Sequence, residues 1–111
     1  MVDFIPDFLS AVTGWDFSLD EMKLAGERIA AVRQAFNVRE GINPLEQPDP
    51  WRAYGRPALK DGPTAGFAVD LDGLVGEFLD EMGWSQDAAV PERGTLERLG
   101  MGDVAEILHN S

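Results

Sequence analysis

Residues 26–41, GERIAAVRQAFNVREG, are the most regular stretch of the sequence and decide its fold. In this stretch and the turn before it, the gaps between apolar residues alternate between three and four, which is the spacing of one face of an α-helix. The apolar positions are Met22, Ala25, Ile29, Val32 and Phe36. Gly41 then supplies a residue at which a helix ends easily. We therefore expect a long helix as the central strut of the fold.

The start of this helix is marked by Ser18 and Glu21. A serine followed three residues later by a glutamate forms a capping box, in which each side chain accepts a hydrogen bond from a backbone N–H group. Asp20 adds a negative charge to the first turn, where the helix dipole favours it. The helix is therefore expected to begin at Ser18 and to run to about Asn37.

A short helix is expected before the central one, over residues 6–13. Proline suits the first turn of a helix because that turn needs no N–H donor, and Pro6 stands there. Gly14 ends this helix. Its buried side is expected to consist of the apolar residues Phe4, Phe8, Leu9 and Val12.

Three helices are expected after the central one. Residues 71–82 carry the clearest amphipathic pattern in the chain, with apolar side chains at every third or fourth position. Asp70 provides the N-cap of this helix, and Trp84 is expected to fold back on its last turn. Two shorter helices are expected around residues 95–99 and 103–108.

Residues 42–69 contain five prolines and three glycines, which exclude a regular helix and disfavour strands. A loop of this length is unusual in a compact domain. It nevertheless carries the apolar residues Leu45, Trp51, Tyr54, Leu59 and Phe67. We therefore expect the loop to be strapped over the helices, where it either completes the core or forms one wall of a binding cleft.

Together these patterns predict an all-α fold. We expect an irregular helical domain of about four to five helices with one long Pro/Gly-rich wrapping loop, formed by residues 1–111 as a single domain. A chain of 111 residues with 44% hydrophobic residues can bury a modest core.

The formal net charge is -11, from 20 acidic and 9 basic residues. Such an excess repels phosphate backbones and anionic lipids, which disfavours nucleic-acid and membrane partners. It could suit a basic partner, but a solvated acidic surface is the simpler interpretation. The absence of cysteine excludes disulfides, thiolate metal ligands and cysteine nucleophiles within this chain. Residues 1–15 have no basic region, and no apolar run approaches a membrane span. We therefore expect no signal peptide and a cytoplasmic location.

Motifs that could carry chemistry are better explained as structural. Asp70 and Asp72 precede Gly73, but the further ligands of a calcium loop are missing, so helix capping is the preferred interpretation. The glycine-rich residues 62–66 lack the lysine of a phosphate-binding loop and predict a turn. His109 is the only histidine, and it has no partners for metal or triad chemistry. The sequence therefore assigns no catalytic, cofactor-binding or metal-binding residue.

The end of the central helix carries a dense polar cluster of Asn37, Arg39 and Glu40. Arg39 could bind a carboxylate through its guanidinium, and Asn37 could cap the helix end. The simpler alternative is a structural junction between helix and loop. Arg52 and Arg56 could stack on the neighbouring aromatic rings or line a site completed by another segment. The candidates for a cleft or an interface are Asn37, Arg39, Glu40 and Arg56.

Several short motifs follow one another along nearly the whole chain: TGWD at residues 13–16, GERI at 26–29, AFNVREG at 35–41, Gly-Trp at 83–84 and PERGTLERLGM at 91–101. In this order they resemble the C-terminal domain of aldehyde ferredoxin oxidoreductases, from about Phe8 to Leu108. Enzymes of that family use tungsten held by pterin dithiolenes and one iron–sulfur cluster. The resemblance implies a helical domain of an oxidoreductase that converts aldehydes to carboxylic acids and passes two electrons to ferredoxin.

No metal or cofactor ligand of the family corresponds to a residue of this chain. In the family, an N-terminal domain holds most of the tungstopterin, and four cysteines upstream of the matched region bind the cluster. The chain is expected to begin just after the last of these cysteines. Tungstopterin and the iron–sulfur cluster are thus implied for the full-length enzyme. The metal-bearing domains would be partners of this chain, and ferredoxin a partner of the parent enzyme only.

Two roles remain open from the sequence. The first is a scaffold that docks on the metal-bearing domains of the parent oxidoreductase and is inert alone. The second is a free-standing protein-interaction module that keeps the fold without enzymatic activity. An exposed apolar patch favours the first role, because a docked domain presents the face that its partner covers, and a uniformly polar surface favours the second. An enzyme in its own right would need a cleft with carboxylates of well-separated pKa values.

Overall fold

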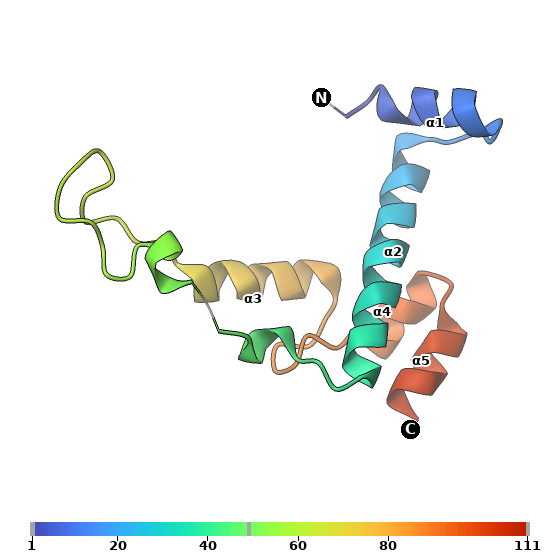
Figure 1. The fold of residues 1–111 in the computed structure, drawn as a ribbon. Coiled ribbons are helices and arrows are strands. Elements are labelled where there is room, and N and C mark those ends of the chain that lie inside the picture. Colours follow the sequence, from blue (N-terminus) through green and yellow to red (C-terminus); the bar gives the residue numbers. More distant parts are fainter. Residues whose placement is uncertain (1, 49, 111) are drawn as a thin grey trace.

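The computed structural model describes residues 2–48 and 50–110. Five α-helices follow one another along them: α1 (Ile5–Thr13), α2 (Leu19–Arg39), α3 (Leu71–Met82), α4 (Arg93–Arg98) and α5 (Gly102–His109). Two 3-10 helices interrupt the long segment between α2 and α3, namely η1 (Pro44–Glu46) and η2 (Trp51–Tyr54). The described residues contain no strand, and an isolated bridge joins Trp84 and Pro91. The expected all-α class with four to five helices is confirmed (Figure 1).

Side-chain caps start two of the helices as the sequence predicts. At α2 the Ser18 hydroxyl accepts a hydrogen bond from the Glu21 N–H group at 3.1 Å, and the Glu21 carboxylate accepts one from the Ser18 N–H group at 3.3 Å. At α3 the Asp70 carboxylate accepts a hydrogen bond from the Gly73 N–H group at 3.1 Å. These bonds satisfy backbone donors that the first turn of a helix leaves free.

The central helix is longer than expected. It continues to Arg39, two residues beyond the predicted end at Asn37. The helical hydrogen-bond pattern extends to Glu40, whose N–H group still bonds to the carbonyl four residues before it. The backbone leaves the helix at Gly41, where φ is 81°. The glycine therefore marks the end more accurately than the polar residues before it.

The core lies where α4 and α5 pack against α2 (Figure 1). Its buried members are Ala31, Leu96, Leu99, Met101 and Ala105. A second cluster joins the end of α3 to the loop that follows and contains Leu79, Trp84 and Ala89. Gln34 is also buried, and its side-chain amide donates a hydrogen bond to the Ala89 carbonyl at 2.9 Å, which ties α2 to this second cluster.

The apolar stripe of α2 does not form the core. Ile29, Val32 and Phe36 are 59%, 46% and 57% exposed. The buried residues of the helix are instead Ala31, Gln34 and Ala35. Helical spacing identifies residues that share a face, but it does not say whether that face meets this chain or another surface.

The expected buried side of α1 is also exposed. Phe4, Phe8 and Val12 are largely accessible, although Leu9 is half-buried. The helix lies across the N-terminal end of α2, away from the α4–α5 pair (Figure 1). Phe4 and Phe8 contact each other edge to face, with 5.8 Å between their ring centroids. The prediction of a buried side is wrong because this chain provides too little surface there to cover it.

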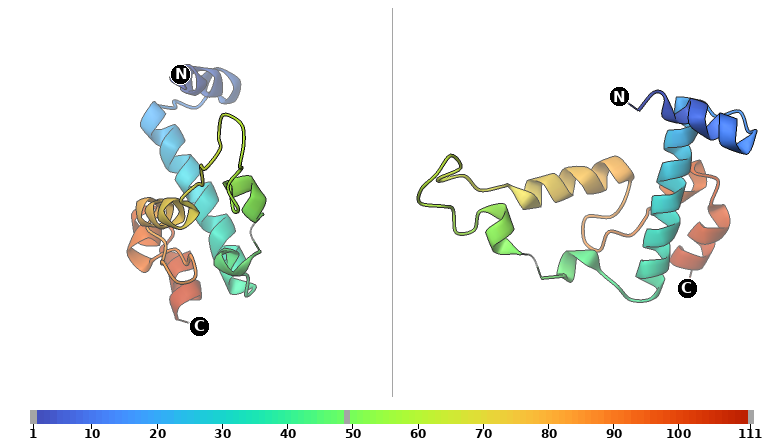
Figure 2. Two further views of the ribbon diagram at one scale, coloured as in Figure 1. Left: turned by 90° about the vertical axis from the view of Figure 1, so that its left-hand side faces the viewer. Right: turned by 45° about the horizontal axis from the view of Figure 1, so that its top comes forward.

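Residues 42–69 form a long Pro/Gly-rich loop, as expected, but they project instead of wrapping. They run alongside α3 and then extend beyond its N-terminal end (Figures 1 and 2). The projecting part, residues 51–69, is termed the arm. Its apolar residues Trp51, Leu59 and Phe67 are exposed. Composition identifies such a segment as irregular without revealing which surface its apolar side chains contact.

The molecule is extended. The radius of gyration over Cα atoms is 18.3 Å, and the dimensions are 54 × 41 × 19 Å. A compact chain of this length has a radius of gyration of about 13 Å. The difference comes from α1, α3 and the arm, because these elements extend away from the core of α2, α4 and α5 (Figure 2).

Candidate docking surfaces

The accessible surface of the chain is larger than a compact fold would leave. It measures 8183 Å², whereas a compact monomer of this mass exposes about 6,000 Å². The excess of about 2,000 Å² is more than twice the area of about 800 Å² that each partner contributes to a standard protein–protein interface. Large exposed apolar side chains stand on four elements: α1 (Phe4, Phe8, Val12), α2 (Ile29, Val32, Phe36), α3 (Leu74, Phe78) and the arm (Trp51, Leu59, Phe67).

A shallow apolar groove of about 150 Å³ runs between α2 and α5. Its apolar walls are Val32, Ala35 and Phe36 of α2 and Val104, Ile107 and Leu108 of α5. Arg39 also lines it, with its guanidinium 5.4 Å from the centroid of the Phe36 ring and Nη2 3.3 Å from the Glu40 carboxylate. This ion pair is about half exposed, so it contributes little to stability. The groove therefore presents apolar area beside an accessible arginine.

Asn37 does not line that groove. It is half-buried and lines two other hollows, one shared with Phe36 and Arg33 and one shared with Trp84. Their volumes are about 360 and 240 Å³. At the helix end, the Ile42 N–H group donates a hydrogen bond to the Asn37 carbonyl at 2.9 Å. The backbone of Asn37 thus helps to close the helix, and its side chain faces the hollows.

Arg56 belongs to the arm. Its guanidinium lies 5.1 Å from the centroid of the Trp51 ring, which is the stacking that the sequence offered as one of two alternatives. The arm projects beyond the N-terminal end of α3, whereas Asn37, Arg39 and Glu40 lie near the C-terminal end of α2 (Figures 1 and 2). The four candidate residues therefore belong to two surfaces, and their contact with a partner stays a prediction.

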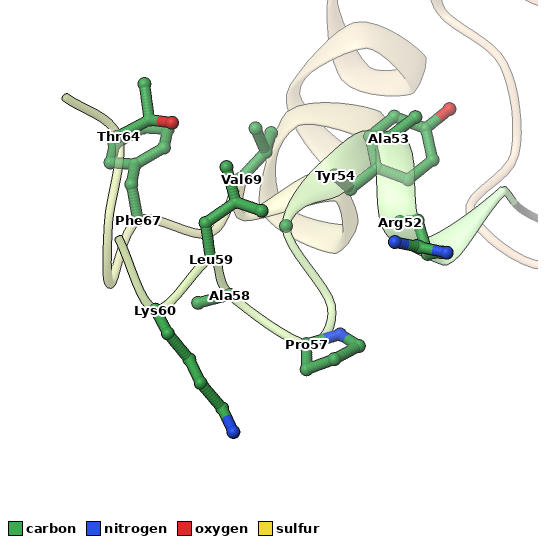
Figure 3. A pocket seen from close by; sticks show the side chains of 11 residues that line it. Arg52, Ala53, Tyr54, Pro57, Ala58, Leu59, Lys60, Thr64, Phe67 and Val69 are labelled. Carbon is green, nitrogen blue, oxygen red and sulfur yellow. The ribbon is translucent and has the colours of Figure 1, made fainter. Parts of the chain in front are cut away.

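The arm curves around a hollow of about 740 Å³ (Figure 3). Its lining is mostly apolar and includes Pro57, Ala58, Leu59, Phe67 and Val69. In Figure 3 the side chain of Lys60 points away from the loop, and the hydroxyl of Tyr54 lies on the opposite side of the view. Small-molecule sites have a few convergent polar groups, and these polar groups diverge. We interpret the hollow as the concave side of a loop that a neighbouring protein surface can fill.

Sequence reasoning considered Arg52, like Arg56, either for ring stacking or for lining a site, and it missed Lys60. Both Arg52 and Lys60 line the hollow of the arm and are exposed. A signal for them was present, because three of the nine basic residues lie within residues 52–60 and no acidic residue separates them.

The titratable groups of the described residues include Asp87, which has a lowered pKa, but they include no metal-binding cluster. No three of their histidine and carboxylate side chains gather closely enough to hold a metal ion. His109 is exposed, as expected, yet its Nε2 atom lies 2.9 Å from the Pro91 carbonyl and joins the end of α5 to the start of α4. The Ser85 hydroxyl lowers the pKa of Asp87 in an exposed loop. Each of these contacts is structural.

Residues 1–101 match the protein family described as "Aldehyde ferredoxin oxidoreductase, domains 2 & 3". The chain is similar to tungsten-containing aldehyde ferredoxin oxidoreductases of Pyrococcus horikoshii (32% identical over 99 residues), Pyrococcus abyssi (34% over 96) and Thermococcus kodakarensis (30% over 97). These matches cover 89%, 86% and 87% of this chain and 16% of the length of each relative. No solved structure gives a significant match. Within residues 2–48 and 50–110, no helix is long and apolar enough to cross a membrane.

Proposed function

Because this chain belongs to the aldehyde ferredoxin oxidoreductase family, we propose that it serves as the C-terminal helical domain of such an oxidoreductase. Residues 1–111 act as one scaffold unit, either within a longer polypeptide or as a separately encoded fragment. The unit docks on the domains that carry the metal, and it is catalytically inert alone.

The observation that carries this proposal is the apolar surface that the chain leaves open. The stripe of Ile29, Val32 and Phe36 has the spacing of a helix core face, yet it is exposed. Monomeric soluble proteins rarely expose large contiguous apolar patches, and such patches mark contact surfaces. Burial of apolar area contributes about 25 cal/mol per Å² of favourable free energy, so a partner that covers these side chains gains from doing so.

The tungstopterin and the iron–sulfur cluster of the parent enzyme do not fit the residues present here. The chain has no cysteine to bind a cluster. Among the described residues, histidine and carboxylate groups form no set of three that could bind a metal. We therefore assign both cofactors to the other domains and derive no chemical step from this chain.

In the parent enzyme, we propose the oxidation of an aldehyde to a carboxylic acid. The aldehyde gains an oxygen atom from water and releases two electrons and two protons, and ferredoxin accepts the electrons. Ferredoxin meets the parent enzyme rather than this chain. We place the assembly in the cytoplasm, and the net charge of -11 speaks against nucleic acid or an anionic membrane as a partner.

The alternative is a free-standing interaction module that keeps the fold without the enzyme. A stable monomeric module is expected to have a uniformly polar surface. The exposed phenylalanines Phe4, Phe8, Phe36 and Phe78 support the docked role instead.

Recovery of the tagged chain from its native host under anaerobic conditions tests the proposal. Mass spectrometry identifies the polypeptide that accompanies or contains the chain, and metal analysis measures tungsten, molybdenum and iron. The expected result is a cysteine-containing polypeptide with iron and with tungsten or molybdenum. A clean, metal-free chain without such a partner would overturn the docked role and leave the interaction module.

A further inference from the structure

The arm is a positively charged element on an acidic chain. Arg52, Arg56 and Lys60 are three of the nine basic residues, and Asp61 is the only acidic residue in residues 51–69. The formal charge of the arm is thus positive, although the whole chain carries -11. The long dimension of the molecule, 54 Å, is several times the Debye length of about 8 Å at physiological salt, so acidic groups far from the arm contribute little to the electrostatic field there.

The cations of the arm lack ion-pair partners within residues 2–48 and 50–110. In the helical part of the chain, Arg98 pairs with Glu27 at 2.7 Å. No described carboxylate lies within ion-pair distance of Arg52, Arg56 or Lys60. Arg56 instead lies over an aromatic ring, and the other two side chains are exposed. Their charge is therefore available to a partner.

The arm holds its shape through its own backbone. The Val69 N–H group donates a hydrogen bond to the Tyr54 carbonyl at 2.8 Å, which closes the base of the loop. The Gly66 N–H group donates one to the Leu59 carbonyl at 2.9 Å, which closes its tip. Gly55 has a φ of 79°, and a Cβ atom there would collide with the backbone of the returning segment. A preformed loop of this kind loses less conformational entropy when it binds.

Apolar side chains accompany the cations. Trp51, Leu59 and Phe67 are 51%, 57% and 64% exposed, and the last two also line the hollow of the arm. Aromatic residues and arginine together are typical of the anchors of protein interfaces. A phosphate backbone offers no apolar area to cover these side chains, so a protein surface is the better partner.

We propose that the arm is a clamp for an acidic protein surface on the metal-bearing domains of the oxidoreductase. An apolar protrusion of that surface fills the hollow, and carboxylates around it pair with Arg52, Arg56 and Lys60. This inference rests on the proposed function, because that function names the partner. Charge pairing of this kind chiefly accelerates association and fixes the orientation of the docked unit.

Photo-crosslinking from inside the hollow tests the clamp. p-Benzoylphenylalanine replaces Ala58, which lines the hollow, in the tagged full chain produced in the native host. Irradiation links this position to whatever fills the hollow, and mass spectrometry sequences the attached peptide. The expected peptide lies outside residues 1–111, belongs to the metal-bearing polypeptide, and contains more aspartate and glutamate than lysine and arginine.

Matched charge variants show whether the cations of the arm matter. Arg52→Glu with Lys60→Glu should lower the crosslinking yield at least about tenfold. Lys23→Glu with Arg28→Glu makes the same change in net charge at exposed positions of α2 and should keep the yield within about twofold. Circular dichroism verifies that both variants keep the helix content.

The other outcomes overturn the clamp. Crosslinks to a second copy of this chain, to nucleic acid or to a peptide without acidic excess would assign the arm to another partner. An equal loss of crosslinking yield in both double variants would show that the effect depends on net charge and not on the position of the cations. If the metal-bearing polypeptide accompanies the chain but the arm crosslinks to something else, the clamp proposal is wrong and the proposed function stands. If no metal-bearing polypeptide accompanies the chain, the proposed function fails with it.

Discussion

Gly83 fixes the path of the chain after α3. Its φ of 68° lies in the left-handed region, and a Cβ atom at this position would collide with the side chain of Thr95. The Thr95 hydroxyl donates a hydrogen bond to the Gly83 carbonyl at 3.0 Å. The turn also places Trp84 edge to face against Phe78, at 5.7 Å between centroids, as expected from the sequence. One glycine therefore ties α3 to α4.

Gly83→Ala should lower the free energy of unfolding by about 1–3 kcal/mol, because it adds both backbone strain and a steric clash. Gly94→Ala is the matched control, since Gly94 lies in α4 with open space around the added Cβ atom. The control should leave stability unchanged or raise it by up to about 1 kcal/mol. Urea denaturation measures both values. Equal effects of the two substitutions would contradict the assigned role of Gly83.

Asp87 gives the fold a local pH dependence. The hydrogen bond from Ser85 is the main reason that its pKa lies below the usual 3.8. A carboxylate with a lowered pKa in the folded state stabilises the fold above its unfolded pKa, and this contribution is lost as the pH falls through the folded pKa. Ser85→Ala should raise the pKa of Asp87 in an NMR titration, whereas Ser85→Thr keeps the hydroxyl and the lowered value. An unchanged pKa in Ser85→Ala would rule out this cause.

The positions of the helices are determined by residues close together in the sequence, which is why they could be predicted. The caps at Ser18 and Asp70 and the final glycines act within a few residues, so all five helices were predictable. The faces they bury were not. Ile29 is larger and more apolar than Ala31, yet Ala31 is 1% exposed and Ile29 59%. The small residue is buried because α4 and α5 approach that side, and such an approach is decided by residues far away in the sequence.

Leu96 is the side chain on which the packing of α4 depends most, because it is fully buried among α2, α4 and α5. Leu96→Ala should lower the free energy of unfolding by about 2–5 kcal/mol through lost contacts and a cavity. Ile29→Ala removes apolar atoms from an exposed face and should change it by less than about 0.5 kcal/mol. Chemical denaturation followed by circular dichroism compares the two. A large effect of Ile29→Ala would mean that the stripe of α2 is part of the core.

At the scale of the whole molecule, the candidate site was only partly predictable. The sequence pointed to Asn37, Arg39, Glu40 and Arg56 as one group of cleft or interface candidates. Arg56 belongs to the arm, however, and the arm projects away from the C-terminal end of α2, where the other three residues lie (Figure 1). The loop that carries Arg56 could not be placed from composition, since nothing within it specifies a contact surface. The structure identifies two further candidate docking surfaces, namely the exposed apolar face of α2 and the arm.

Val32→Ser with Phe36→Ser should abolish co-recovery of the metal-bearing polypeptide while lowering the free energy of unfolding by only about 1 kcal/mol. Both side chains are exposed in the chain itself and line the groove beside α5, so their apolar area serves a partner rather than the core. Lys23→Ser with Arg28→Ser changes exposed polar positions of the same helix and should leave recovery intact. Iron and tungsten per chain measure the recovery. If the Val32→Ser, Phe36→Ser variant retained the same iron and tungsten per chain, this face of α2 would not be part of the docking surface.

Hydroxyl-radical footprinting of the chain, alone and within the recovered metal-bearing assembly, tests the docked scaffold most directly. Phe36, Phe67 and Phe78 are more than half exposed in the chain itself, whereas Trp84 is buried within it. The docked role predicts that the phenylalanines react several times more slowly in the assembly, while Trp84 reacts slowly in both states. Equal labelling of the three phenylalanines in both states, with the metal-bearing polypeptide present, would contradict it.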